Sequence, residues 1–227
     1  MTEWYEELDY DENPFTMEGE TYGFENLINE LDYAVNAGNM VLVEGEEGTG
    51  KTKLLKEMIK KYGGFRKIAY VDCKKMEKSL DIETLMKKRN GTLGRILNIK
   101  PKNMIVLLDD IDALSEKNCE RIKYYYDQNY IRSVIFATRM GQTSIFSDSV
   151  KQRINKVLEM KPLSDYEAVQ IVRDKVGDLL SDHLIKEIYS MSDRNLKAFL
   201  SNCEKVSAVA LKQKQISREE LNKILGK

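Results

Sequence analysis

Short runs of hydrophobic residues alternate along much of the chain with longer stretches in which hydrophobic positions recur at helical spacing. The runs that predict strands are 40–43, 67–71, 104–108, 133–137 and 156–160. Runs without polar alternation indicate strands that are buried on both faces of a sheet. Helical spacing predicts helices over 51–62, 82–89 and 119–126. This order of elements predicts an α/β fold with a parallel five-stranded sheet.

The pattern changes after Pro162, where strand-like runs cease and helices with regular N-caps follow. The expected N-caps are Ser164, Ser181, Ser217 and, for a long helix that reaches about Lys212, either Ser192 or Asp193. We therefore expect an all-α lid domain over residues 163–227, an α/β core over 39–162 and a separate N-terminal segment over 1–38.

Composition narrows the class of protein. The chain has 227 residues, 42% hydrophobic residues and 3 prolines, which suits a globular protein with a sizeable core. Its start is acidic, unlike a signal peptide, and no hydrophobic run is long enough to span a membrane, so we expect a cytoplasmic protein with no membrane contact. Cys73, Cys119 and Cys203 lie far apart and His183 is the only histidine. Neither a disulfide framework, nor a zinc site, nor histidine-based catalysis is expected.

Charge is distributed unevenly, although the formal net charge is only −1. Residues 1–50 contain 14 acidic side chains and no lysine or arginine, whereas residues 51–227 carry 36 basic and 23 acidic side chains. Such a division is typical of an acidic segment on the chain's own basic surface, of contact with a neighbouring subunit, or of a basic face for nucleic acid. The sequence leaves these three interpretations open, together with solvated charge that has no partner.

The segment between the first predicted strand and the following helix predicts a phosphate site. It fits the pattern G-x-x-x-x-G-K-[ST] with Gly45, Glu46, Glu47, Gly48, Thr49, Gly50, Lys51 and Thr52. Main-chain N–H groups of the loop and the helix N-terminus bind phosphate, Lys51 reaches the β- and γ-phosphates, and the Thr52 hydroxyl is a ligand for Mg²⁺. Glu46 and Glu47 are unusual beside a triphosphate, and we expect them to weaken nucleotide affinity.

The third predicted strand ends in two acids, Asp109 and Asp110, which is the Walker-B arrangement. Asp109 is expected to hold Mg²⁺ through water, and Asp110 to polarise the attacking water as a general base. Asp110 is one methylene shorter than the glutamate usual at this position, which favours slow turnover. The guanine-reading motif Asn-Lys-x-Asp is absent, because Val157 and Leu158 follow Asn155-Lys156. We therefore expect ATP as the nucleotide.

Together these motifs resemble the AAA+ ATPase superfamily over about residues 13–225, and most closely its branch of archaeal and eukaryotic replication-initiator ATPases. That branch often continues the Walker-B strand as Asp-Glu-x-Asp-x-Leu, matched here by residues 109–114. Asn13-Pro14-Phe15, followed by residues 22–27, is similar to the family's N-terminal segment that packs over the adenine. The resemblance implies a P-loop NTPase core with a helical lid, an N-terminal segment on the core near the adenine, and Phe15 either on the base or plugging the core.

The resemblance also implies roles for residues outside the two motifs. Thr138, at the end of the fourth strand, matches the sensor-1 position, whose polar side chain orients the attacking water. Arg153, before the fifth strand, matches the arginine finger given to a neighbouring subunit, which implies a homo- or hetero-oligomer. Either Arg194 or Lys197 matches the sensor-2 position; the two are expected to share a helix face, and the sequence does not choose between them.

Initiator ATPases usually carry a winged-helix domain after the lid, whereas this sequence stops at Lys227, so we do not expect sequence-specific DNA binding. Two features keep nucleic acid open as a partner. The connection 73–103 is rich in lysine and arginine, a composition found at phosphate backbones and, more often, on solvated helices. Tyr124, Tyr125 and Tyr126 can stack on bases, although consecutive tyrosines on a helix are more often divided between core and surface.

We expect an enzyme that binds Mg·ATP and hydrolyses it to drive or switch assembly on a protein or nucleic-acid client, with DNA replication or maintenance as a candidate process. The alternative is a slowly hydrolysing nucleotide-dependent switch that recruits a protein partner and has no direct DNA role. Asp110 and Arg153 separate the two, because the first requires both residues to act. A small-molecule kinase fits less well, since paired acids after the strand suit the activation of water.

Overall fold

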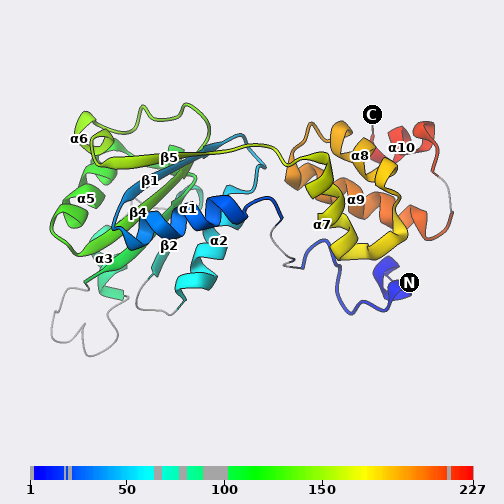
Figure 1. Ribbon diagram of the computed structural model, residues 1–227, viewed down its shortest axis with the longest axis horizontal. Helices are drawn as coiled ribbons and strands as arrows, with labels where there is room; N and C mark the ends of the chain where they lie inside the picture. The colour runs from blue at the N-terminus through cyan, green and yellow to red at the C-terminus, as the bar shows by residue number, and fades with distance from the viewer. Residues whose placement is uncertain are drawn as a thin grey trace. The chain divides into compact units, whose positions relative to one another are not determined.

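The computed structural model describes residues 3–17, 19, 22–63, 68–76, 81–88, 102–213 and 216–226 (Figure 1). The chain divides into two compact units. A sheet unit comprises residues 26–161, and a helical unit comprises residues 1–25 and 162–227. The division after residue 161 lies one residue from the predicted boundary between core and lid. The predicted segment 1–38 is divided between the two units rather than belonging to one of them.

Five parallel strands form the sheet, in the order β2-β3-β4-β1-β5. They are β1 Met40–Gly45, β2 Ile68–Asp72, β3 Met104–Asp109, β4 Ile131–Thr138 and β5 Ile154–Met160. Every predicted strand is confirmed, with ends displaced by at most two residues. In β5, at one edge of the sheet, only Leu158 and Met160 are buried, which accounts for its weak hydrophobic run.

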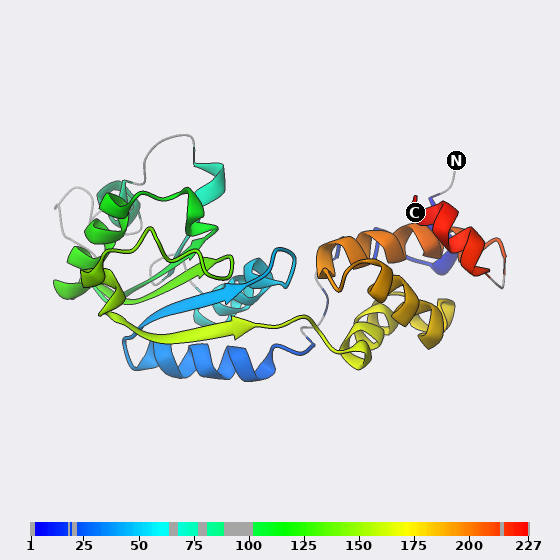
Figure 2. The same ribbon diagram turned by 90° about the horizontal axis from the view of Figure 1, so that it is seen from above.

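Helices cover both faces of this sheet (Figures 1 and 2). They are α1 Glu25–Asn36, α2 Lys51–Tyr62, α3 Ile82–Lys88, α5 Glu116–Asp127 and α6 Asp148–Lys151, with short 3-10 turns η2 Cys73–Lys75 and η3 Ile111–Ala113. The Tyr62 hydroxyl of α2 donates to the carboxylate of Asp32 on α1 at 2.6 Å, which joins these two helices on one face. Helix α5 begins three residues before the predicted helix, because the Ser115 side chain accepts a hydrogen bond from the Asn118 N–H and caps it.

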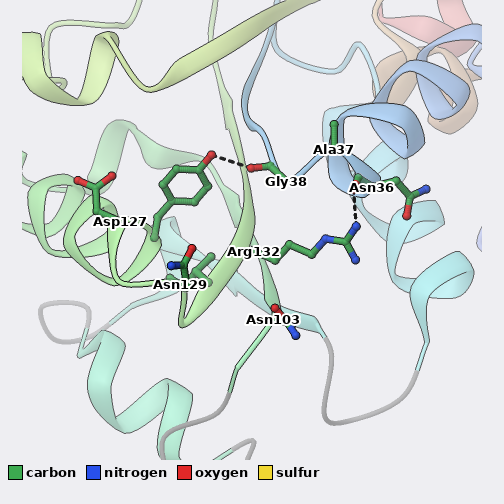
Figure 3. Close-up of a pocket in the computed structure, with 9 residues that line it drawn as sticks. Asn36, Ala37, Gly38, Asn103, Asp127, Asn129 and Arg132 are labelled. Atoms are coloured by element: carbon green, nitrogen blue, oxygen red, sulfur yellow. Dashed lines mark hydrogen bonds between the residues drawn. The ribbon is translucent and has the colours of Figure 1, made fainter.

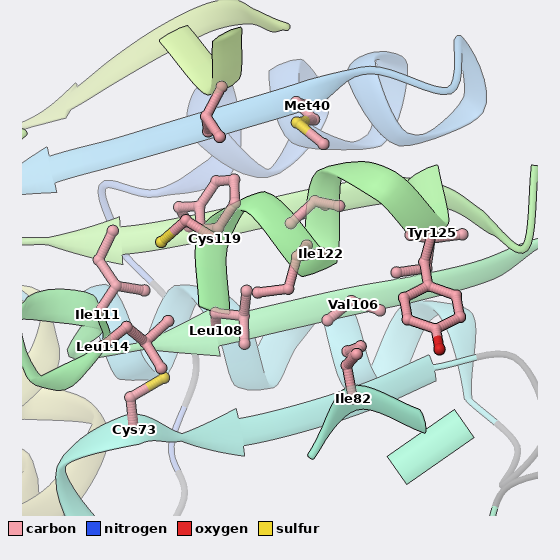
Figure 4. Packing of buried hydrophobic residues seen from close by; sticks show 14 of the residues in the cluster. Met40, Cys73, Ile82, Val106, Leu108, Ile111, Leu114, Cys119, Ile122 and Tyr125 are labelled. Carbon is pink, nitrogen blue, oxygen red and sulfur yellow. The ribbon is translucent and has the colours of Figure 1, made fainter. Parts of the chain in front are cut away.

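A hydrophobic core lies between the sheet and helices α3, α5 and α6 (Figure 4). Its members include Met40, Leu42, Val106, Leu108, Val134 and Phe136 from the strands, and Ile82, Cys119, Ile122, Tyr125 and Val150 from the helices. Side chains alternate along a strand, so Leu107 and Asp109 lie on the opposite face from Leu108. The alternation that fills this core therefore also directs the last acid of β3 toward α2.

The helical unit contains the predicted all-α domain. Its elements are η1 Trp4–Leu8, α7 Asp165–Val176, η4 Gly177–Leu179, α8 Asp182–Met191, α9 Leu196–Ala210 and α10 Arg218–Leu225. Ser164, Ser181 and Ser217 are N-caps as predicted.

The predicted cap of α9 was wrong. Its N-cap is Asn195, and Ser192 instead ends α8. The physical reason lies in the connecting turn, where Asp193 and Arg194 have φ of 51° and 55°. A left-handed backbone cannot continue a right-handed helix, so α9 starts only after Arg194.

Hydrogen bonds to main-chain and side-chain oxygens connect residues 13–17 to the helices of the helical unit. The ammonium of Lys175 on α7 is buried and donates to the carbonyl oxygens of Pro14 and Met17, at 2.6 and 2.9 Å. Asn13 donates to the carboxylate of Glu204 on α9 at 2.7 Å. Phe15 is buried, and its ring centre lies 6.0 Å from that of Trp4. Contact of Phe15 with adenine stays a prediction.

The three cysteines are free thiols, and each is buried. Burial, reinforced by nearby carboxylates, raises the pKa of both Cys73 and Cys119 to about 12. Burial also raises the pKa of Cys203. None of the helices in the described part of the chain is long and apolar enough to cross a membrane.

Candidate functional site

The loop predicted to bind phosphate lies between β1 and α2, as the motif requires. Gly45 ends β1 beside β5, and a Cβ atom there would lie 2.8 Å from the carbonyl oxygen of Met160. Gly48 and Gly50 have φ of 80° and 100°, a region that favours glycine. Helix α2 begins at Lys51, so the unpaired N–H groups of its first turn adjoin the loop. Glycine is therefore required for the shape of this loop at three positions.

The ammonium group of Lys51 is held inside the loop. Its Nζ donates to the carbonyl oxygens of Gly45 and Glu46, at 2.7 and 2.8 Å, and the residue is 7% exposed. Burial lowers the pKa of Lys51, and the nearby carboxylates of Asp110 and Asp109 oppose this effect. The lysine is thus fixed in a position suited to binding phosphate oxygens.

The two glutamates of the loop contribute mainly through their main chain. Both residues are exposed, and the carbonyl oxygen of Glu46 accepts hydrogen bonds from Lys51 and, at 2.9 Å, from the Thr49 hydroxyl. The carboxylate of Glu47 lies 3.6 Å from Nη2 of Arg139. Acidic residues are therefore compatible with this loop, because a basic residue faces one of them and the other shapes the loop through its backbone.

Thr52 and Asp109 form the predicted metal-binding pair. Thr52 Oγ1 donates to Asp109 Oδ2 at 2.7 Å, and the Tyr70 hydroxyl donates to the same oxygen at 3.0 Å. The main-chain N–H of Asp110 donates to Asp109 Oδ1 at 3.2 Å. A hydroxyl and a carboxylate are hard oxygen ligands, which Mg²⁺ accepts together with water and phosphate oxygens. The residues present fit Mg²⁺.

Asp110, the predicted general base, occupies a tight turn directly after β3. Its φ is 51°, a conformation that short polar side chains such as aspartate tolerate. The side chain is partly buried, and burial together with the Asp109 carboxylate raises the pKa of Asp110. A raised pKa makes a carboxylate a stronger base, which suits the acceptance of a proton from water.

Thr138 ends β4 beside the phosphate loop. Its strand partner on β1 is Glu44, the residue before Gly45, and its buried hydroxyl donates to the carboxylate of Asp112. The other oxygen of Asp112 lies 3.8 Å from Nε of Arg139. The structure therefore brings together the loop, the acids after β3 and the predicted sensor-1 residue.

Sequence reasoning missed Tyr70 and Arg139. Burial and the Asp109 carboxylate raise the pKa of Tyr70, so its hydroxyl is a donor at neutral pH. Tyr70 precedes Asp72 by two residues at the end of β2, so the two side chains lie on the same face of the strand. This alternation is the sequence signal that places Tyr70 beside the strand-end acids. Arg139 directly follows Thr138, and only the fold brings it to Glu47 and Asp112.

Arg153, the predicted arginine finger, lies directly before β5, at the amino-terminal end of the strands. The loop that follows β1 lies at their carboxyl end. A strand of 7 residues spans roughly 20 Å, so Arg153 does not reach the loop of its own chain. Its Nε donates to Asp127 at 2.8 Å, and Lys123 lies 3.0 Å from the other carboxylate oxygen. Burial raises the pKa of Asp127, but the hydrogen bonds from Arg153 and Lys123 outweigh it, and the pKa is lowered.

A pocket of about 500 Å³ opens beside Asp127 near the amino-terminal ends of the strands (Figure 3). Its lining includes Asn36, Asn103, Asn129 and Arg132. Tyr126 donates to the carbonyl oxygen of Gly38 at 2.6 Å, and the Arg132 guanidinium donates to that of Asn36. These two bonds join α5 and β4 to the end of α1, so the polar groups on this pocket wall serve packing.

The two candidates for sensor 2 lie in the helical unit. Nη2 of Arg194 is 2.9 Å from the Asp165 carboxylate, and its guanidinium lies 5.5 Å from the centre of the Tyr189 ring. Lys197 is exposed in the first turn of α9. They do not share a helix face as expected, because Arg194 precedes the helix. Their contact with nucleotide stays a prediction.

The features that kept nucleic acid open are described only in part. Within the basic connection 73–103, residues 77–80 and 89–101 lie outside the described residues. Tyr125 is buried, Tyr126 donates a hydrogen bond to the main chain, and Tyr124 is 56% exposed. The expected division of these tyrosines between core and surface is confirmed.

Comparisons with solved structures support the fold. The structure of Aeropyrum pernix Orc1 in complex with DNA is similar with a TM-score of 0.70 and 16% identity, over 92% of this chain and 66% of that one. A single-residue variant of Thermotoga maritima RuvB is similar with a TM-score of 0.63 and 18% identity, over 90% and 69%. The Holliday junction branch migration motor RuvB of the same organism gives a TM-score of 0.62 and 15% identity, over 92% and 69%.

This chain thus spans about two thirds of each of these proteins. No curated protein sequence matches it. The similarity to solved structures confirms the predicted P-loop α/β fold with a helical C-terminal domain. The family model described as "AAA domain" matches residues 37–169, more than half of the chain. The chain therefore belongs to the AAA domain family, as its motifs indicate.

Proposed function

We propose that this chain is an AAA+ ATPase that binds Mg·ATP and hydrolyses it to ADP and phosphate. The observation that carries the proposal is the meeting of Lys51, the Thr52–Asp109 pair and Thr138 at the carboxyl edge of one parallel sheet. Ligands of open α/β sheets bind outside the carboxyl ends of the strands. The membership of the AAA domain family supports the same proposal.

In this proposal the loop main chain and Lys51 bind the β- and γ-phosphates. Thr52 and Asp109 would hold Mg²⁺, which when bound neutralises charge on these phosphates. Thr138 orients the attacking water, and Asp110 accepts its proton. The water oxygen bonds to the γ-phosphorus while the bond from that phosphorus to the bridging oxygen breaks, and ADP leaves with the electron pair.

The proposal includes an oligomer. Arg153 lies at the amino-terminal end of the strands, whereas its own phosphate loop lies at their carboxyl end. Its pairing with Asp127 leaves the Arg153 side chain 48% exposed. Arginine fingers given to a neighbour stabilise the charge that develops on the transferred phosphoryl group. We therefore infer that Arg153 acts on the nucleotide of a second subunit.

The client is proposed to be a protein or nucleic-acid assembly in the cytoplasm, with DNA replication or maintenance as the candidate process. The support comes from the solved structures that share the fold: Orc1 was solved in complex with DNA, and RuvB is described as a Holliday junction branch migration motor. The alternative of a slowly hydrolysing switch without a DNA role is favoured by Asp110, whose carboxylate is shorter than that of glutamate.

The test measures ATPase rate per subunit against protein concentration, with and without single- and double-stranded DNA, at two salt concentrations. Lys51→Ala provides the background. A rate that rises with concentration and with DNA at low salt would support a shared-site ATPase acting on nucleic acid. A slow rate that is independent of both would support the switch, and no hydrolysis above the Lys51→Ala background would contradict the enzyme.

A further inference from the structure

We propose that Tyr70 is a positioning residue for the metal-binding carboxylate of Asp109. The P-loop and Walker-B motifs do not include Tyr70, yet its hydroxyl donates to Asp109 Oδ2 at 3.0 Å. The inference rests on the proposed function, because it concerns the Mg²⁺ that accompanies ATP. It extends the site, which already includes the ends of β1, β3 and β4, to a fourth strand, β2.

The sheet register explains how a tyrosine two residues from its strand end reaches this carboxylate. Tyr70 pairs with Leu107, and Asp72 pairs with Asp109, on the adjacent parallel strands β2 and β3. Paired residues and their neighbours two positions along lie on the same face of a sheet. The Tyr70 side chain therefore lies diagonally across from Asp109, on the face that α2 covers, and its length brings the hydroxyl to the carboxylate.

The hydrogen bonds of Asp109 show what Tyr70 contributes. Oδ1 accepts from the main-chain N–H of Asp110, and Oδ2 accepts from Thr52 and Tyr70, so donors fix both carboxylate oxygens of a residue that is only 3% exposed. Thr52 is itself a metal ligand in the proposed function, and its hydroxyl oxygen must then face the ion. Among the described residues, the side-chain donors to Asp109 are Thr52 and Tyr70, and Tyr70 is not a metal ligand in the proposed function.

Partners that orient metal ligands contribute strongly to metal affinity. Their removal typically lowers affinity or activity by about 10- to 100-fold. Tyr70→Phe removes the hydroxyl and keeps the ring, so the packing of β2 against α2 is retained. We therefore expect a selective loss of Mg²⁺ affinity in this variant, with the phosphate loop unaffected.

The experiment titrates Mg²⁺ into the full chain with a fluorescent ATP analogue and follows equilibrium binding of the analogue. For Tyr70→Phe we expect the half-saturating Mg²⁺ concentration to rise about tenfold, and the affinity in EDTA to stay within about twofold of wild type. Tyr62→Phe is the matched control, because it removes a tyrosine–aspartate bond of 2.6 Å on the same unit, away from Asp109. It is expected to leave both values unchanged.

A double-mutant cycle tests the route of the effect. In an Asp109→Asn background, Tyr70→Phe should cause no further change in Mg²⁺ dependence if Tyr70 acts through Asp109. An equal loss of binding in EDTA and in Mg²⁺, an unchanged Mg²⁺ dependence, or additive effects in the cycle would overturn the inference while leaving the proposed function standing. Wild-type protein that binds the analogue no better than Lys51→Ala would overturn both.

Discussion

The hydroxyl of Thr52 donates a hydrogen bond to the carboxylate of Asp109, 57 residues further along the chain, at 2.7 Å. The contact joins the first turn of α2 to the last residue of β3. Neither group reaches the other unless α2 packs on the sheet in the observed register. The candidate metal pair is therefore a product of the complete sheet unit and not of the loop alone.

Lys51→Ala is expected to weaken binding of Mg·ATP by at least about 100-fold, because it removes the buried ammonium that the loop carbonyls hold in place. Isothermal titration calorimetry measures the affinity. Lys56→Ala, an exposed lysine on the same helix, is the control and should bind as wild type does. Unchanged affinity in Lys51→Ala would contradict the assignment of the phosphate loop.

Gly45→Ala is expected to destabilise the sheet unit by about 1–3 kcal/mol and to abolish nucleotide binding, because the new methyl group meets the carbonyl oxygen of Met160. Urea unfolding measures the free energy. Gly141→Ala is a useful comparison, since its φ is 74° but open space surrounds the added carbon, so only backbone strain of about 1 kcal/mol is expected. Equal effects of the two changes on nucleotide binding would contradict a special role for Gly45.

Thr138→Val preserves the shape of a buried side chain and removes the hydroxyl that donates to Asp112. We expect turnover to fall about 100-fold with little change in ATP affinity, because the proposed role of Thr138 is to orient the water. Steady-state rates and equilibrium binding are measured together. A variant that loses affinity and keeps its turnover would show that Thr138 serves binding instead.

Arg153→Ala and Asp110→Asn are each expected to reduce ATPase activity severely, and an equimolar mixture is expected to regain part of it. In the mixture, a subunit with intact Asp110 meets a neighbour with intact Arg153. The control mixes Arg153→Ala with a chain that carries both substitutions, where no complete site forms. Absence of recovery in the first mixture would count against a shared site.

The bond between Tyr62 and Asp32 predicts a pH-dependent stability. The Tyr62 hydroxyl lowers the pKa of Asp32, burial opposes this, and Lys61 assists. The stabilisation is therefore fully present above the unfolded-state pKa of about 3.9 and is lost as the pH falls through the lower folded-state pKa.

Tyr62→Phe should accordingly cost about 1 kcal/mol at neutral pH and progressively less as the pH is lowered below the unfolded-state pKa of Asp32. Urea unfolding of both proteins over a series of pH values from neutral to acidic gives the difference. A cost that is independent of pH would show that the tyrosine contributes through packing alone.

Much of the fold could be predicted from sequence, because the signals are local. The buried strands appear as uninterrupted hydrophobic runs, and the caps at Ser164 and Ser217 follow from side chains that bond main-chain N–H groups three residues away. The cap of α9 obeys the same rule, since the Asn195 side chain accepts from the Ala198 N–H, but the rule alone does not choose Asn195 over Ser192 and Asp193. Two consecutive residues with left-handed φ, Asp193 and Arg194, place the start of α9 after Arg194, and the sequence pattern does not show this backbone conformation.

The residues of the candidate site also divide into those that local sequence motifs identify and those that only the three-dimensional structure identifies. Lys51, Thr52 and Asp109 stand in motifs whose spacing carries the chemistry, whereas Tyr70 becomes visible only when β2 and β3 are in register. Local sequence patterns likewise did not show that the segment 1–38 is divided between the two units. Its first part joins the helical unit through Lys175, a buried cation that finds carbonyl partners more than 150 residues away in sequence.

Burial of all three thiols has a practical consequence for spectroscopy. Thiolate is the reactive form, and burial both shields the thiols and raises their pKa, so we expect the native protein to react slowly with maleimides. Cysteines introduced as Tyr33→Cys in the sheet unit and Tyr166→Cys in the helical unit, at positions 73% and 70% exposed, would carry fluorophores without competition. Energy transfer between the two labels would then test whether nucleotide binding changes the distance between the labelled positions.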